Sequence, residues 1–213
     1  MGIQINQYPL TATTINDDDF FDLDQWNGSA FESKKIKGST LKNAVVPGLF
    51  TQTSDVTVTA TTTESTLIGS GVGSLIVPAN GFNVGDTFRL TVKGIISAHN
   101  NDTFTFKLKS GAVILATSGA ITMPTVTAKV FEITSDFVIH SIGGVGVAEI
   151  VTAGSFCYNK DSSNAFEGQD FLTTNNSTFD TTIGNTLNLT VQFSSTNVNN
   201  SMNTKIVILE KTY

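Results

Sequence analysis

The stretch Thr103-Phe104-Thr105-Phe106-Lys107-Leu108-Lys109 places an apolar side chain at every second position, with a polar one between each pair. Successive side chains of a β-strand point to opposite faces of a sheet, so this period puts one face on a core and the other in water. An amphipathic helix would need apolar positions three and four residues apart. Residues 103–109 therefore predict a half-buried strand.

The same period of two recurs in the stretches 56–60, 88–92 and 187–193. Less regular apolar segments predict further strands at 65–69, 75–78, 112–117, 129–139, 145–158, 166–173 and 205–213. Turn-forming pairs such as Asn80-Gly81 and Gly184-Asn185 lie between the strands. No segment after Gln52 shows the 3.6-residue period of an amphipathic helix. Roughly eight to eleven short strands predict an all-β fold, an antiparallel β-sandwich or jelly roll.

Two of these segments predict contacts between copies of the chain. The run Ile206-Val207-Ile208-Leu209 is apolar on both strand faces, which predicts a last strand buried twice, at the centre of a sheet or against a second copy. The apolar, glycine-rich segment 142–150 is interpreted as a strand whose backbone approaches another subunit closely. We expect a homo-oligomer, a trimer by analogy with jelly rolls on stalks, with a dimer as the alternative.

The composition excludes several classes of protein. Charged residues make up 14% of the 213 residues, against about 25% in typical domains, and the net charge is −6. With Arg89 as the one arginine, the clustered cations of a nucleic-acid site are missing. The apolar runs are far shorter than the roughly 20 residues that cross a bilayer, so we expect no membrane partner. Cys157 alone forms neither an intrachain disulfide nor a cysteine zinc site, and we expect it to be buried and inert.

The first 46 residues differ from the rest. An acidic stretch, 17–24, is followed by a basic one, 34–42, and aromatic residues lie among them. Fewer than about 50 residues without a disulfide or metal bury too little apolar area to fold alone. We therefore predict an extended N-terminal arm, residues 1–46, that buries its aromatic side chains against another surface, and a head domain, residues 47–213. The candidate attachment residues are Phe20, Phe21, Asp22, Asp24, Trp26, Phe31, Lys34, Lys35 and Lys37.

The charges of the arm allow two interpretations. Several carboxylates between Asp17 and Asp24 could bind a cation such as Ca²⁺. The glycine and the distal glutamate of a helix-loop-helix calcium site are missing. A solvated turn, or ionic links to the lysines of a neighbouring subunit, is the favoured reading.

Catalytic residues are few, and we expect no enzyme and no cofactor. His99 and His140 lie far apart with no acidic residue at a telling spacing, so both are read as ordinary histidines. The glycine strings 69–73 and 143–146 lack the following helix of a dinucleotide site and are assigned to turns, bulges or tightly packed strands. A glycan depolymerase would need paired carboxylates. The sequence does not pair the available ones, which are Glu132, Asp136, Glu167 and Asp170.

Carbohydrate binding is a further hypothesis. The loops 159–170, 173–180 and 196–203 are rich in Asn and Thr, and aromatic residues lie nearby. Aromatic faces combined with amide and carboxylate groups suit sugars, although the same residues suit plain solvent-facing loops. The candidate glycan-facing residues are Tyr158, Phe166, Phe171 and Phe179.

The segment from Asp17 to Asn43 carries a pattern of three successive parts. It reads Phe20-Phe21-Asp22-Leu23-Asp24, then Trp26-Asn27-Gly28, then Ser33-Lys34-Lys35-Ile36-Lys37-Gly38-Ser39-Thr40-Leu41. This segment resembles the N-terminal module of many bacteriophage fibre and appendage proteins. The body looks like the jelly-roll heads of phage virion proteins, on Val77-Pro78-Ala79-Asn80, Val84-Gly85-Asp86-Thr87-Phe88 and the stretch 187–195.

The resemblance implies a virion structural protein, made in the host cytoplasm and carried on the particle surface. The arm would dock on another virion protein of the capsid or tail, and the head would project, available to host glycans. Because a long repetitive shaft is missing, a short head fibre or capsid decoration is favoured over a long tail fibre. The alternative from another class is a soluble, carbohydrate-binding, lectin-like module. Deleting residues 1–43 should leave a folded head that no longer joins particles.

Overall fold

The computed structural model describes residues 20–26, 31–37, 48–160 and 165–213, the first two ranges by their backbone and the exposure of Lys35. The chain divides into two compact units, Met1–Pro47 and Gly48–Tyr213. Each unit is described by itself.

The first unit contains an antiparallel hairpin of β1 (Phe20–Trp26) and β2 (Phe31–Lys37). The Cα atoms of Asp22 and Lys35 are partners in its register, and so are those of Trp26 and Phe31. The described parts of the acidic and basic stretches, residues 20–24 and 34–37, therefore lie side by side in the hairpin. Opposite charges in directly opposed positions favour one strand register over its alternatives.

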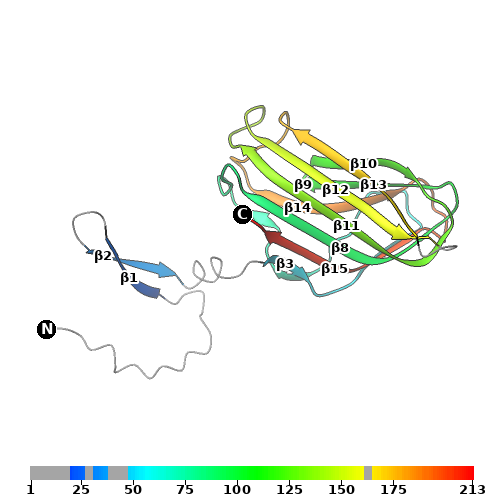
Figure 1. The fold of residues 1–213 in the computed structure, drawn as a ribbon, viewed down its shortest axis with the longest axis horizontal. Helices are drawn as coiled ribbons and strands as arrows, with labels where there is room; N and C mark the ends of the chain where they lie inside the picture. The colour runs from blue at the N-terminus through cyan, green and yellow to red at the C-terminus, as the bar shows by residue number, and fades with distance from the viewer. Residues whose placement is uncertain (1–19, 27–30, 38–47, 161–164) are drawn as a thin grey trace, which may run out of the picture. The chain divides into compact units, whose positions relative to one another are not determined.

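The second unit is a sandwich of two antiparallel sheets (Figure 1). The larger sheet has eight strands in the order β13-β12-β11-β8-β15-β3-β6, with β4 paired to β15, and the smaller has five in the order β10-β9-β14-β5, with β7 paired to β14. The bounds in the larger sheet are β3 (Gly48–Gln52), β4 (Val56–Thr59), β6 (Gly71–Gly73), β8 (Thr87–Ala98), β11 (Val126–Ser141), β12 (Glu149–Asn159), β13 (Phe166–Asn175) and β15 (Ser201–Lys211). Those in the smaller sheet are β5 (Ser65–Thr66), β7 (Ile76–Val77), β9 (Thr103–Ser110), β10 (Val113–Thr122) and β14 (Asn185–Phe193).

The all-β class and the antiparallel sandwich predicted from the alternating pattern are confirmed. The strand segments predicted from the sequence include neither β3 nor β6, whereas β5 and β7 fall in the predicted segments 65–69 and 75–78 but pair over only two residues each.

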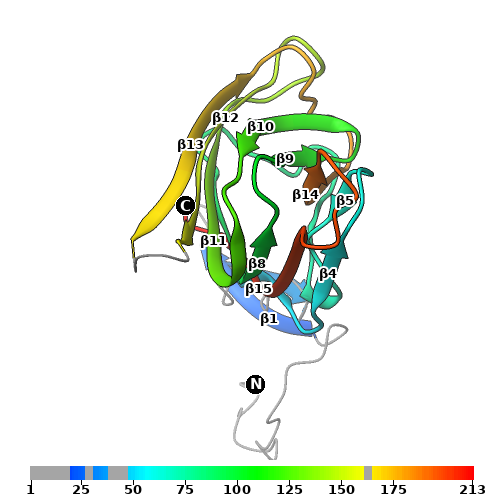
Figure 2. The same cartoon turned by 90° about the vertical axis from the view of Figure 1, so that its right-hand side faces the viewer.

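The core lies between the two sheets and is built largely from the positions that alternate. Phe104, Phe106 and Leu108 of β9 are at most 1% exposed. The ring of Phe106 lies 4.6 Å from that of Phe156 on the opposite sheet, measured between centroids. Figure 2 shows the two sheets facing each other across this layer. Aromatic side chains that span the gap contribute both buried area and a favourable ring geometry.

Side-chain amides close one side of the sandwich, where β10 of the small sheet meets β13 of the large one. Gln169 Nε2 donates to the Ser118 carbonyl at 2.7 Å, and Asn175 Nδ2 donates to the Ile114 carbonyl at 2.8 Å. These two bonds satisfy carbonyl groups that a free strand edge would leave open.

The C-terminal strand is central, as the sequence predicted, but it is not buried twice. It pairs with β8 on one side and with β3 and β4 on the other. Val207 and Leu209 are buried, whereas Ile206 is 45% exposed. Only one face of the large sheet packs on the small sheet, so the other face of β15 is open within this unit.

The segment 142–150 is not the strand that its apolar glycine-rich sequence suggested. β11 ends at Ser141 and β12 begins at Glu149, and a turn joins them. Gly143 and Gly146 have φ angles of 150° and 80°, which an ordinary side chain rarely adopts. The glycines of this segment therefore serve the turn rather than close packing of strands.

Candidate functional site

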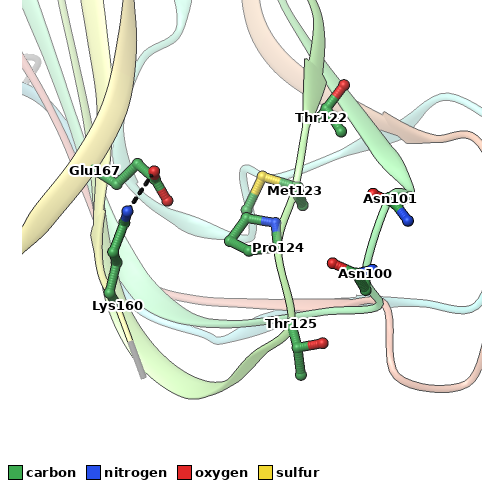
Figure 3. A pocket seen from close by; sticks show the side chains of 8 residues that line it. All are labelled: Asn100, Asn101, Thr122, Met123, Pro124, Thr125, Lys160 and Glu167. Atoms are coloured by element: carbon green, nitrogen blue, oxygen red, sulfur yellow. Dashed lines mark ion pairs between the residues drawn. The ribbon is translucent and has the colours of Figure 1, made fainter. Parts of the chain in front are cut away.

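A groove opens at the end of the sandwich where β8, β10 and β12 finish, and we call it the distal groove (Figure 3). Its volume is about 700 Å³, within the range of small-ligand sites. The residues that line it are Asn100, Asn101, Thr122, Met123, Pro124, Thr125, Lys160 and Glu167.

Three connections that are distant in sequence build the distal groove. The turn between β8 and β9 supplies the two asparagines, the connection from β10 to β11 supplies 122–125, and the end of β12 and start of β13 supply the charged pair. Asn101 N–H donates to the Met123 carbonyl, and Met123 N–H donates to the Asp102 carbonyl, both at 2.9 Å. Asn101 adopts a φ of 66°, which asparagine tolerates better than most residues. The backbone of two walls is thus fixed without a ligand.

An ion pair forms the third wall. Lys160 Nζ lies 2.7 Å from Glu167 Oε1, and the Tyr158 hydroxyl donates to Glu167 Oε2 at 2.5 Å. Lys160 and then Tyr158 hold the pKa of the Glu167 carboxyl below its usual value. Burial, and secondarily the bond to Glu167, raises the pKa of the Tyr158 phenol. The wall therefore presents an ionised carboxylate whose charge Lys160 compensates.

A carboxylate-centred cluster lies beside the groove. Asp102 Oδ2 accepts hydrogen bonds from Ser195 Oγ at 2.7 Å and from Asn200 Nδ2 at 2.8 Å, and His99 Nδ1 lies 3.4 Å away. The bonds from Ser195 and Asn200 lower the pKa of Asp102. Acyl-transfer chemistry needs a histidine between the hydroxyl and the carboxylate. Here the carboxylate lies between the hydroxyl and the histidine, so the cluster ties the β8–β9 turn to the β14–β15 connection and does not activate Ser195.

The second histidine is at the other end of the sandwich. His140 Nδ1 lies 2.9 Å from Glu149 Oε1 across the turn between β11 and β12. The sequence analysis predicted neither of the two histidine–carboxylate pairs. Asp102 comes close to His99 within the turn between β8 and β9, and Glu149 comes close to His140 across the turn between β11 and β12.

The predicted glycan-facing aromatic cluster is wrong for most of its members. Tyr158 and Phe179 are 2% and 1% exposed, and Phe171 is half-buried. Phe179 packs against Phe82 at 5.8 Å, and Tyr158 stacks on Phe156 at 5.5 Å, so both rings fill the core. Of the four, Phe166 alone is exposed, at 74%. Tyr158 nevertheless reaches the distal groove through the bond from its hydroxyl to Glu167.

The carboxylates considered for sugar hydrolysis do not pair with each other. Glu132 lies 3.2 Å from Lys93, and Asp136 lies 2.8 Å from Arg89, both on the outer face of the large sheet. Glu167 is the one carboxylate lining the distal groove. Opposite-charge pairing across strands explains these positions as sheet-stabilising contacts.

Two further findings concern the residues that the structure describes. No three His, Cys, Asp or Glu side chains among them form a group that could hold a metal ion, and no helix there has the length and apolar character to cross a membrane. Cys157, expected to be buried, is half-buried on β12, and desolvation raises the pKa of its thiol.

The candidate attachment residues fall in the hairpin unit. Backbone positions are described for all of them, and Lys35 is exposed. The other side chains lie outside the described residues, as do Asp17, Asp18 and Asp19 of the possible cation site. These other side chains are Phe20, Phe21, Asp22, Asp24, Trp26, Phe31, Lys34 and Lys37.

The end of the sandwich opposite the distal groove exposes a cluster of apolar side chains, and we call it the proximal end. It holds the start of β8 and the turn between β11 and β12, and the strand that begins at Gly48 enters there (Figure 1). Thr181 N–H donates to the Gly143 carbonyl at 2.9 Å, and Gly85 N–H donates to the Ile139 carbonyl at 2.8 Å, which brings three loops together. The exposed apolar side chains of these loops are Val84, Ile142, Val145, Val147 and Ile183.

Comparison of the chain with protein-family models, with curated proteins and with solved structures found no match.

Proposed function

We propose that the chain is a structural protein of a bacteriophage virion, a short head fibre or capsid decoration. Residues 1–46 attach it to a capsid or tail protein, and the sandwich is presented on the particle surface, where it can contact the host. The observation that carries this proposal is the cluster of apolar side chains at one end of the sandwich. The proximal end exposes Ile142, Val145 and Val147 on one turn, whereas at the distal end the exposed Phe166 and Val198 stand singly on separate segments beside a groove lined mostly by amides, hydroxyls and one ion pair.

A cluster of exposed apolar side chains at one end suits a head held at that end and free at the other. Exposed apolar clusters on a protein surface mark contact sites, because their burial is favourable. The chain enters the sandwich at the proximal end, at Gly48. The resemblance of 17–43 to phage appendage modules supports the same polarity.

The hairpin supports attachment through shape and charge. Its register sets Asp22 opposite Lys35 and Phe21 opposite Ile36. A charged ribbon in a fixed register can discriminate between docking positions, because a wrong position leaves charges uncompensated.

The protein is further proposed to be a homo-oligomer, a trimer. The outer face of the large sheet carries Leu172 on β13, 73% exposed, and Val130 on β11, 56% exposed. We favour a second copy of the chain as the partner that covers this face, because the face continues into the open face of β15. Sedimentation equilibrium of the full chain should give about three times the monomer mass, and a monomer at high concentration would contradict the proposal.

The test of function uses particles of the phage that encodes the chain. Mass spectrometry of gradient-purified particles should find the protein in a fixed ratio to the capsid protein. The full-length variant Trp26→Ala should be depleted from particles, whereas Phe166→Ala, an aromatic change on the head, should be retained. Absence of the wild-type chain from purified particles would overturn the proposal.

A soluble lectin-like module is the second candidate, and the distal groove is the observation that favours it. Saturable glycan binding by a chain that never sediments with particles would select this alternative.

A further inference from the structure

We infer that the distal groove binds a neutral saccharide, with Asn100, Asn101 and the Lys160–Glu167 pair holding its hydroxyl groups. The inference concerns the groove alone and holds whether or not the chain is carried on a particle.

The groove is formed before any ligand arrives. Hydrogen bonds between backbone groups join the 100–102 turn to Met123, and the Asp102 cluster holds that turn to Asn200 and Ser195. Pro124 fixes the backbone of the segment between the walls. A site that is rigid in its free form loses little conformational entropy on binding, which favours affinity for a small polar ligand.

The free hydrogen-bonding groups match hydroxyl groups. Within the described part of the chain, no hydrogen bond engages the side chains of Asn100, Asn101, Thr122 or Thr125, and all four are exposed. Each amide offers a donor and an acceptor, and each hydroxyl offers both. A saccharide hydroxyl is itself a donor and an acceptor, so neighbouring sugar hydroxyls can pair with one amide. Sulfate offers only acceptors and would leave the amide oxygens unused.

The charge of the groove selects a neutral ligand. Its two ionic groups are 2.7 Å apart and compensate each other, so the lining carries no net charge. An anionic ligand bound to Lys160 would lie beside the ionised Glu167 carboxylate and be repelled by it. A neutral hydroxyl can instead bond the remaining lone pairs of Glu167 and the remaining protons of Lys160 with the pair intact.

A small apolar strip completes the site. Figure 3 shows Met123 and Pro124 between the charged wall and the asparagine wall. The Met123 side chain is buried, which leaves the half-exposed Pro124 ring as the apolar surface in the groove. The C–H face of a sugar ring has an apolar character that this surface accepts, while its hydroxyls reach the two polar walls.

The test titrates the full-length protein, labelled with ¹⁵N, with neutral and acidic saccharides. A glycan array first selects the strongest neutral binder, and galacturonic acid and N-acetylneuraminic acid serve as acidic probes. The neutral saccharide should bind saturably, with a Kd of about 1 mM or tighter. Its largest amide shifts should fall at Asn100, Asn101, Thr125 and Glu167. No neutral binder on the array, or binding confined to acidic sugars, would overturn the inference.

Two variants separate the groove from the rest of the surface. Asn100→Ala and Asn101→Gly remove one amide each, and glycine keeps the left-handed φ at position 101. Each should weaken binding about tenfold, as expected for one lost hydrogen bond to a bound polar group. The control is Asn199→Ala, an exposed asparagine outside the groove lining, which should bind as wild type. Unchanged affinity in both groove variants, with folding verified by their spectra, would contradict the assignment.

Discussion

Tyr158 and Glu167 stand directly opposite each other on β12 and β13, and the phenol donates a 2.5 Å hydrogen bond to the carboxylate. The ring of Tyr158 is in the core, whereas Glu167 lines the distal groove. The Tyr158 side chain thus connects the packed core of the sandwich to the charged wall of the distal groove, which Lys160 and Glu167 form. A core position in this chain therefore influences a surface site.

Replacing Tyr158 by phenylalanine should raise the pKa of Glu167 toward its usual value. The pKa would stay below that value because Lys160 remains the larger cause of its depression. Since the folded-state pKa is depressed, the stabilisation is present above the usual pKa of glutamate and is lost as the pH falls through the folded value. The variant should lose about 1 kcal/mol at neutral pH and less in acid. An NMR titration of the Glu167 carboxyl measures the shift.

The control for this variant is Tyr213→Phe, since Tyr213 is 85% exposed. A Glu167 pKa that is the same in Tyr158→Phe and in wild type would show that the hydrogen bond has no electrostatic effect.

Glu64 should make stability depend on pH in the acid range. Its carboxylate lies 2.7 Å from both Lys107 and Lys109 and accepts a hydrogen bond from Thr190. These contacts lower its pKa from 4.5 to about 2, with the bond to Lys107 the largest cause. The contribution is complete above about pH 4.5 and disappears as the pH falls toward 2.

Glu64→Gln should reduce the free energy of unfolding at pH 7 by about 1–2 kcal/mol, a value limited by solvent screening. The difference from wild type should vanish near pH 2, as urea unfolding at several pH values would show. Asp170→Asn, at an exposed carboxylate with no ion pair among the described residues, should show no such dependence. Equal losses at pH 7 and pH 2 would point to packing rather than charge.

Gly94→Ala should destabilise the head by several kcal/mol. A Cβ atom at this position would lie 2.0 Å from the carbonyl oxygen of Asn203 on the neighbouring strand β15, so backbone would have to move. The irregular register of β15 between Thr204 and Ile206 lies next to this contact. Overpacking against backbone in a central strand pair is costly. Thermal melting of Gly94→Ala against Gly144→Ala, where an added Cβ meets nothing within 4 Å, isolates the effect.

Phe166 and Phe179, both predicted from the sequence to face a glycan, should differ in how much stability their replacement by alanine costs. Phe179→Ala removes a ring that is 1% exposed and should cost about 3–5 kcal/mol of stability. Phe166→Ala removes a ring that is 74% exposed and should change stability by less than about 0.5 kcal/mol. Denaturant midpoints measure both. A similar loss in the two variants would mean that Phe166 is covered in solution, as an oligomer interface would cover it.

The sequence predicts the sandwich well because alternation is a local signal. Phe104, Phe106 and Leu108 alternate with polar residues, and the burial follows that pattern. The prediction fails on β13, where Phe166 and Phe171 stand five residues apart and therefore face opposite sides of the strand. Composition marked both rings as equivalent, but only the register with β12 decides which of them is exposed.

The distal groove could not be predicted from the sequence. Asn100, Pro124 and Lys160 come from three connections, and nothing in their local sequence distinguishes them from ordinary turn residues. The nearest signal was the Asn-rich loop after β12, which contributes Lys160 but not the asparagines. Sites assembled by sheet topology need the topology to be known first.

The most direct test of the proposed virion role is an image of intact particles, by cryo-electron microscopy at a resolution that separates subunits. The account predicts sandwich-shaped heads on the surface, each with its proximal end toward the particle and its distal groove toward solvent. Density for residues 1–46 should contact another virion protein around Trp26. Particles without such heads, or heads whose first 46 residues touch no other virion protein, would contradict it.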